Sequence, residues 1–109
     1  MESDRVFLIR CVKERKIFWT YHCNMRLGKR ALSRAAILGS LLNCEIIEEY
    51  PKDFPLPSCL CLCYNNGDNL HCVIGLDRKD DNIRIITVYR PDPLKWDEGL
   101  KKRRAHDLP

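Results

Sequence analysis

Residues 58–77 read SCLCLCYNNGDNLHCVIGLD, and this stretch decides the fold of the chain. Two runs of alternating side-chain character flank the dipeptide Asn66-Gly67. Asn-Gly between such runs is the strongest short-range signal of a β-hairpin, because both turn residues must adopt positive φ. A two-residue turn also fixes which residues face each other across the strands. It predicts three pairs: Leu62 with His71, Cys61 with Cys72, and Cys59 with Ile74.

The predicted hairpin has two chemically different faces. One is small and apolar, and collects Cys59, Cys61, Cys63, Leu70, Cys72, Ile74 and Leu76. The other collects Leu60, Leu62, Tyr64, His71, Val73 and Gly75. We expect the helices to cover the apolar face. Alternate cysteines on a strand are a conceivable metal site, but the surrounding Leu and Ile residues favour ordinary packing of reduced thiols. We therefore expect no metal and no cofactor.

Further strands are predicted on both sides of the hairpin. Residues 45–50 form a short charged segment, as is typical of a sheet edge. Residues 83–90 form an alternating run that follows a polar turn and stops at Pro91. If this last strand pairs Val73 with Thr87, then His71 lies beside Tyr89. A slip of one residue would send Tyr89 to the opposite face, and the sequence leaves this register open.

The first 44 residues predict helices instead. Ser3, Thr20 and Ser33 each precede a segment suited to a helix, and each is a good N-cap residue. The helices are expected from Ser3, over residues 21–30, and from Ser33 to near Asn43. The predicted fold class is therefore α+β, with N-terminal helices packed on one face of a four-stranded antiparallel β-meander. We expect a single domain over residues 1–109, divided into helical residues 3–43, sheet residues 45–90 and a basic C-terminal tail over 95–109.

Composition limits the class of protein. The chain has 109 residues, of which 45% are hydrophobic and 31% charged, as is typical of one folded domain. Its uncharged runs are far shorter than the ~20 residues of a membrane span, and its first residues lack the pattern of a signal peptide. We therefore expect a cytoplasmic protein without membrane contact. The net charge of +4 is concentrated in residues 1–34, which favours a polyanionic partner.

His22, Arg26 and Arg30 follow one another at intervals of four residues. On a helix they would form one stripe, in which the two like charges repel each other slightly. Taken alone, the stripe favours an ordinary solvated helix face, and a face that binds an anion is the alternative.

Several motifs resemble one bacterial family. The run His22-x-x-x-Arg26-x-x-x-Arg30-x-Leu32-Ser33 resembles the opening of the family called domain of unknown function four-two-five-eight. The resemblance extends over roughly residues 17–104. It continues through Cys44-Glu-Ile-Ile-Glu-Glu-Tyr-Pro51, Pro57-Ser-Cys-Leu60, Leu70-His71-x-Val73 and Ile85-Ile-Thr-Val-Tyr-Arg-Pro91, and ends at Trp96. The cysteine-rich strand departs from the family pattern without affecting its polar positions.

Members of that family resemble RelE-like and MqsR-like toxins. The resemblance implies a metal-independent endoribonuclease with a RelE/barnase-like toxin fold, acting as an mRNA interferase. It also implies an RNA substrate, reached with or without the ribosome, and a partner, a small zinc-finger antitoxin encoded beside the toxin.

The chemistry of such an enzyme suggests roles for particular residues. A base must take the proton of the 2′-hydroxyl, and an acid must protonate the leaving 5′-oxygen. We assign these roles to His22 and His71, assisted by Tyr89, without deciding which histidine is the acid. Phosphate and RNA contacts are assigned to Arg26, Arg30, Arg90, Lys101, Arg103 and Arg104. Tyr64 or Trp96 is a candidate for stacking a base.

Two alternatives remain open. The chain could be a module that binds RNA or a protein without cleaving anything, or a structural protein held by zinc. The single-site version of the enzyme hypothesis makes one geometric demand. The second helix must bring His22 within reach of the sheet face that carries His71.

Overall fold

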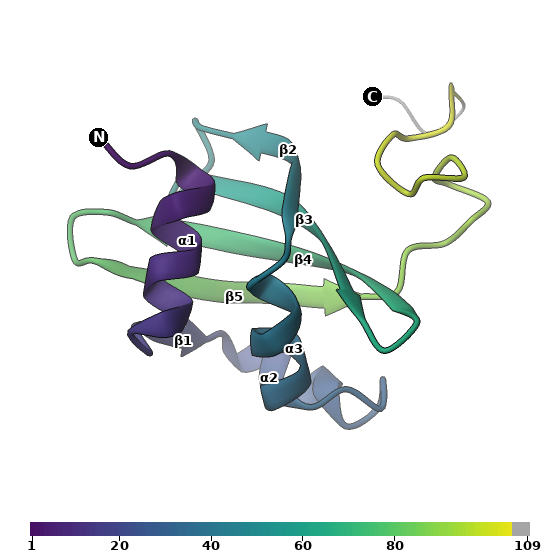
Figure 1. Cartoon of the computed structure of the whole chain (residues 1–109), viewed down its shortest axis with the longest axis horizontal. Helices are drawn as coiled ribbons and strands as arrows, with labels where there is room; N and C mark the ends of the chain where they lie inside the picture. The colour runs from purple at the N-terminus through teal and green to yellow at the C-terminus, as the bar shows by residue number, and fades with distance from the viewer. Residues whose placement is uncertain (106–109) are drawn as a thin grey trace.

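The predicted hairpin forms the centre of a five-stranded sheet (Figure 1). The computed structural model describes residues 1–105. The helices are α1 (Asp4–Lys13), α2 (Tyr21–Leu27) and α3 (Arg34–Leu41). The strands are β1 (Ile17–Trp19), β2 (Glu45–Tyr50), β3 (Ser58–Asn65), β4 (Asp68–Asp77) and β5 (Asn82–Tyr89). Their order across the sheet is β1-β5-β4-β3-β2. The chain is thus an α+β protein with three helices in its described part.

The turn between β3 and β4 has the geometry that its sequence predicts. Asn66 has a φ of 49° and Gly67 a φ of 85°, so both turn residues lie in the left-handed region. The three predicted residue pairs of this hairpin are all present. The expected division of the hairpin into two faces is therefore confirmed.

The register between β4 and β5, which the sequence did not determine, includes a β-bulge. Val73 pairs with Thr87 and His71 with Tyr89, while the neighbouring pair is Ile74 with Ile85, so Ile86 is the extra residue. A bulge changes which alternate residues of a strand face a given side. Here it lets Ile85 and Val88 both enter the core while Tyr89 stays beside His71 on the other face.

The prediction of four antiparallel strands is wrong, because the sheet has a fifth strand and is mixed. β1 pairs in parallel with β5, with Phe18 beside Arg84. Backbone bonds from Ile83 N–H to the Lys16 carbonyl and from Thr20 N–H to the Ile85 carbonyl hold it there. Three residues are too few to show a period of two, so only the long-range pairing reveals this strand.

The helices cover the apolar sheet face, as expected. Figure 1 shows α1 and α3 crossing the same side of the sheet. Buried residues of α1, α2 and α3 join Cys59, Cys61, Cys63 and Cys72 of the sheet in one core cluster. We call this side the helix face. None of the helices in residues 1–105 has the length and apolar character that crossing a membrane requires.

The N-caps of the three helices are the predicted ones. The hydroxyls of Ser3, Thr20 and Ser33 each accept a bond from a backbone N–H in the first turn. The second helix is shorter than predicted, since α2 ends at Leu27 and not at Arg30. Gly28 has low helix propensity, and Ala31 adopts a positive φ of 52° that no helix accommodates.

The opposite side of the sheet carries Leu60, Leu62, His71 and Val73, and we call it the His71 face. Residues 92–105, the yellow segment after β5 in Figure 1, pack against part of it, and we call them the C-terminal strap. The strap contains a β-bridge between Trp96 and Arg103 and no α-helix in its described part. The predicted tail reaches residue 109, and its residues 106–109 lie outside the described part.

Candidate functional site

His71 is fully buried and both of its ring nitrogens are engaged. Its Nε2 lies 2.8 Å from the Leu100 carbonyl oxygen, and its Nδ1 lies 3.2 Å from the Tyr89 hydroxyl. A carbonyl oxygen only accepts, so Nε2 carries the proton and Nδ1 accepts from Tyr89. Trp96 covers the ring edge-on, with the ring centroids 4.4 Å apart. In this packing His71 joins the sheet to the strap and has no open side for a substrate.

The electrostatics of this pair match its burial. Burial lowers the pKa of His71 below its ordinary value, although the Leu100 carbonyl and Glu48 favour the proton. Burial also raises the pKa of Tyr89. The folded environment therefore favours a neutral imidazole beside a neutral phenol. This is the state that the two hydrogen bonds require.

The basic residues of the strap are held by the protein itself. Lys101 forms an ion pair with Glu45 at 2.9 Å. Arg103 makes two bonds to Glu48, at 3.0 and 3.1 Å, and its guanidinium also lies over the Trp96 ring. Arg104 donates to the Pro93 carbonyl and stays exposed. Two of the three predicted RNA contacts in this segment are therefore already neutralised.

The α2 helix presents the other predicted residues to solvent. Cys23 and Leu27 face the core, so their neighbours His22 and Arg26 lie one turn apart on the exposed side. His22 touches the edge of the Tyr21 ring. Neither the His22 nor the Arg26 side chain forms a hydrogen bond or ion pair with another residue in the described part of the chain. Both side chains are free to meet a ligand.

Arg30 stays in line with this stripe although α2 has ended. Its backbone N–H still bonds to the Arg26 carbonyl, so it follows Arg26 by about one turn. Its Nη1 donates to the Val88 carbonyl of β5, and Arg90 donates from Nη1 to the Arg30 carbonyl at 2.6 Å. Arg90 is also paired with Asp68. Arg30 and Arg90 are therefore brought together where β5 ends.

His22 and His71 do not share a site. The α2 helix packs on the helix face through Cys23 and Leu27, in the same cluster as Leu70 and Cys72. His71 stands between those two strand residues and so points to the opposite face of the sheet. The single-site hypothesis is therefore wrong in its geometry. His71 and Tyr89 belong to one environment, while His22, Arg26 and Arg30 belong to another.

The stretch of sequence around α2 carries charge of one sign. Residues 15–44 include six Lys or Arg residues and no Asp or Glu. Arg34 donates to Asn24 and lies over the Trp19 ring, and Lys29 is exposed. We use the term α2 surface for His22, Arg26, Lys29, Arg30 and Arg34. The sequence analysis missed Lys29 and Arg34, although the absence of carboxylates from this stretch is visible in the sequence.

The seven cysteines are all buried thiols. The Sγ atoms of Cys63 and Cys72 lie 3.5 Å apart, and those of Cys59 and Cys61 lie 3.7 Å apart. Within residues 1–105, no group of three or more His, Cys, Asp or Glu side chains is arranged to hold a metal ion. The cysteines serve as part of the apolar core that positions α2 and α3.

The comparison with known families identifies the chain. Residues 19–90 match the family described as Domain of unknown function (DUF4258). This is well over half of the chain, so the protein belongs to that family. No curated protein and no solved structure matches it. The matched range runs from the end of β1 to just after β5, and so includes both the α2 surface and the His71 face.

Proposed function

We propose that this protein is a metal-independent endoribonuclease that binds and cleaves RNA at the α2 surface. One observation carries the proposal. An exposed imidazole, His22, stands one turn from Arg26 in a segment that has no carboxylate from residue 15 to residue 44. Cations without carboxylate partners attract the phosphate backbone, and an imidazole transfers protons near neutral pH.

The reaction can be written for the residues present. His22 accepts the proton of a 2′-hydroxyl as that oxygen bonds to phosphorus, and the bond from phosphorus to the 5′-oxygen breaks. The products are a 2′,3′-cyclic phosphate and a 5′-hydroxyl, whose proton comes from water. Arg26 and the unbonded guanidinium nitrogens of Arg30 stabilise the charge that builds on the phosphate. In this assignment His22 takes part in the reaction, and His71 has only a structural role in the packing of the strap.

The biological setting that we propose is a toxin–antitoxin pair. The resemblance to RelE-like and MqsR-like toxins that the sequence motifs imply supports it, and an α+β fold with helices on one face of the sheet is compatible with it. A small zinc-finger antitoxin is the proposed partner. Co-purification with a small Cys-x-x-Cys protein encoded by a neighbouring gene is the expected result.

A second candidate is an RNA-binding module without catalytic activity. The burial of His71 favours it, because His22 is then the one accessible imidazole in residues 1–105. Cleavage of RNA without a metal needs both a base and an acid, whereas binding needs only the cations.

One set of measurements separates the two candidates. Labelled RNA, free or on translating ribosomes, is incubated with the protein in EDTA, and the product ends are analysed for 2′,3′-cyclic phosphate. Binding of uncleavable 2′-deoxy-substituted RNA is measured by fluorescence anisotropy with Arg26→Ala, and with Lys52→Ala at the other edge of the sheet as matched control. Loss of one phosphate contact should reduce the slope of log affinity against log salt by roughly 0.7.

The outcomes differ for each candidate. The endoribonuclease proposal predicts cyclic-phosphate products from the wild type and none from His22→Gln. Tight binding that depends on Arg26, but without cleavage of free or ribosomal RNA, would identify the binding module. Equal binding by Arg26→Ala and Lys52→Ala would contradict both.

A further inference from the structure

Phe18 lies in β1, the strand that the sequence did not predict, and its side chain is exposed. In β1, Ile17 and Trp19 pack against the core, so Phe18 between them points to the opposite side. It lies in register with Arg84 of β5, which is also exposed. Phe18 is 61% exposed, and Tyr21, three residues later, is 74% exposed. Two large aromatic rings are thus open to solvent at the entrance to α2.

A hollow lies beside Phe18. One cavity of about 310 Å³ is lined by Phe18, Trp19, Thr20 and Arg84. This volume is at the lower end of the range of small-molecule sites. A second cavity, of about 660 Å³, shares Phe18 and Arg84 and extends along Arg15 and Lys16. The two cavities flank the same aromatic ring and the same guanidinium.

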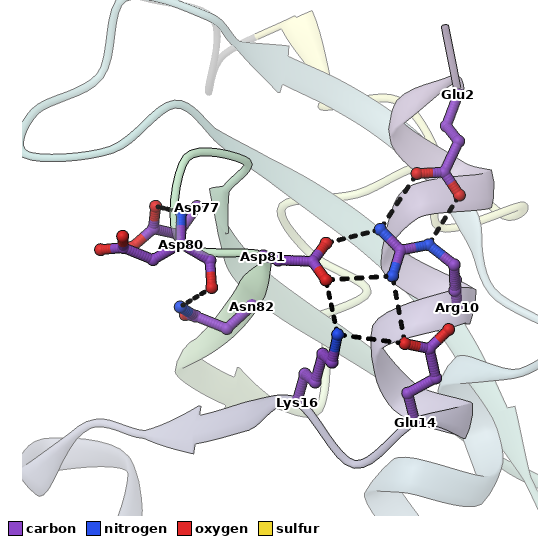
Figure 2. Close-up of polar contacts among 8 residues, drawn as sticks. All are labelled: Glu2, Arg10, Glu14, Lys16, Asp77, Asp80, Asp81 and Asn82. Carbon is purple, nitrogen blue, oxygen red and sulfur yellow. Dashed lines mark hydrogen bonds and ion pairs between the residues drawn. The ribbon is translucent and has the colours of Figure 1, made fainter.

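Two acidic residues, Asp80 and Asp81, also line the second cavity. Asp81 forms ion pairs with Arg10 and Lys16, each at 2.6 Å. Figure 2 shows Asp81 extending towards these two cations, while Asp80 extends in the opposite direction. The Arg15 side chain forms no hydrogen bond or ion pair within the described residues, and Arg84 has one long contact of 3.5 Å to Asp77. The guanidinium of Arg15 therefore has no bonded carboxylate, and that of Arg84 has only this distant one.

We propose that the cavity at Phe18, Trp19, Thr20 and Arg84 binds an unpaired nucleobase, so that the substrate of this protein is single-stranded RNA. The inference rests on the proposed function and names its substrate class. A base stacks on the Phe18 ring beside the Arg84 guanidinium, and its phosphates face the α2 surface on one side and Arg15 on the other. Bases in a duplex are already stacked and cannot enter, so the cavity discriminates against double-stranded RNA.

The charge around the cavity favours a nucleotide over a protein side chain. An apolar side chain of a protein gains nothing from the Arg84 and Arg15 guanidiniums, whereas a nucleotide brings both a flat apolar base and a negative phosphate. Thr20, Tyr21 and His22 continue directly from the cavity into α2. A base held at Phe18 would therefore place a neighbouring phosphate near His22.

The experiment measures fluorescence anisotropy with labelled single-stranded oligouridylate and with a duplex of equal length. The proteins are the wild type, Phe18→Ala, and Phe54→Ala as matched control, since Phe54 is 90% exposed and lies in the loop between β2 and β3. We expect the wild type to prefer the single strand. Phe18→Ala should bind it about tenfold more weakly, with an unchanged salt slope, and Phe54→Ala should bind it normally. Equal affinity for the two RNAs, or no effect of Phe18→Ala, would overturn the inference.

Two further measurements separate this inference from the proposed function. Titration with uridine monophosphate should quench Trp19 fluorescence in the wild type but not in Trp19→Phe or Phe18→Ala. If the protein binds no RNA but shows this quenching, the nucleobase cavity stands and the proposed function falls. If neither is seen, both fall. Sedimentation tests the alternative occupant, because a wild-type dimer that Phe18→Ala abolishes would assign the surface to a protein contact and overturn the inference.

Discussion

The Nε2 of His71 donates a hydrogen bond to the backbone carbonyl of Leu100 at 2.8 Å, which ties the middle of the sheet to a residue 29 positions later. The same ring accepts a bond from Tyr89 and is covered by Trp96. A histidine that the sequence offered as a catalytic group is thus the anchor of the C-terminal strap. We therefore expect His71 to affect stability and its dependence on pH, and His22 to affect catalysis.

Acid should destabilise the protein through His71. Its pKa is lowered by burial in the folded chain, so below about pH 6.5 the unfolded chain takes up the proton more readily. The contribution to stability is complete above that pH and is lost as the pH falls through it towards the lowered folded value. Glu48 and Arg103 also face the ring, with opposite effects on its pKa.

The check is urea unfolding at several pH values between 7.5 and 5. His71→Gln keeps a donor and an acceptor but has no titrating proton, so its free energy of unfolding should vary less with pH than that of the wild type. His22→Gln, which removes an exposed imidazole, is the control and should keep the wild-type dependence. Identical pH dependence in all three proteins would contradict the prediction.

Trp96 should be the main apolar contributor to the docking of the strap. It is 4% exposed and packs on His71. Replacing such a residue by alanine typically costs 3–5 kcal/mol, so we expect Trp96→Ala to lower the free energy of unfolding by roughly 3 kcal/mol. Lys101→Ala, which removes an exposed ion pair with Glu45, should cost less than about 1 kcal/mol. Equal losses in the two variants would show that the strap is held by its surface charges.

The buried cysteines should be unreactive in the folded protein. Burial raises the pKa of Cys11 and of Cys23, and hydrogen bonding to Cys44 and Cys59 raises that of Cys61. The thiolate is the reactive form, so high pKa and burial act together at these three residues, whereas at Cys44, whose pKa is lowered by its hydrogen bond with Cys61, burial alone opposes reaction. Mass spectrometry after iodoacetamide treatment should find no label on the native protein and seven labels after unfolding. Rapid labelling of native Cys63 or Cys72 would contradict the packing of the core.

The sequence predicted the central hairpin of the sheet better than the edge strand β1. Asn66-Gly67 determined the register of β3 and β4, because a two-residue turn with positive φ leaves no freedom in the pairing. The same reasoning could not see β1, whose three residues carry no periodicity and depend on β5 for their pairing. Nor could local patterns decide whether Tyr89 would lie on the same face as His71, because that register includes a β-bulge.

The candidate site was predicted only in part, because sequence patterns report local spacing and not long-range packing. The spacing of His22, Arg26 and Arg30 is local, and the structure keeps them in line even though the helix ends at Leu27. The burial of His71 is not local, because it depends on a strap whose polar and basic residues gave no sign of packing on a sheet. Ion pairs with Glu45 and Glu48 neutralise two of its cations.

Arg30 should contribute to structure and to binding, unlike Arg26. Its Nη1 holds the Val88 carbonyl, and a lysine cannot reproduce a planar guanidinium. We expect Arg30→Lys to lower the free energy of unfolding by about 1 kcal/mol and to weaken RNA binding severalfold. Arg26→Lys keeps a free exposed charge and should leave stability unchanged. Denaturant titration and anisotropy check both; equal stability of the two variants would show that the Val88 contact contributes nothing.

The most direct test of this account compares the cleavage rates of His22→Gln and His71→Gln on the same single-stranded RNA in EDTA, at a temperature where circular dichroism shows both variants folded. The account predicts that His22→Gln loses cleavage, since its imidazole is the accessible base, while His71→Gln stays within a few-fold of the wild-type rate. Loss of cleavage in His71→Gln with activity retained in His22→Gln would contradict it, and would place the reaction on the opposite face of the sheet.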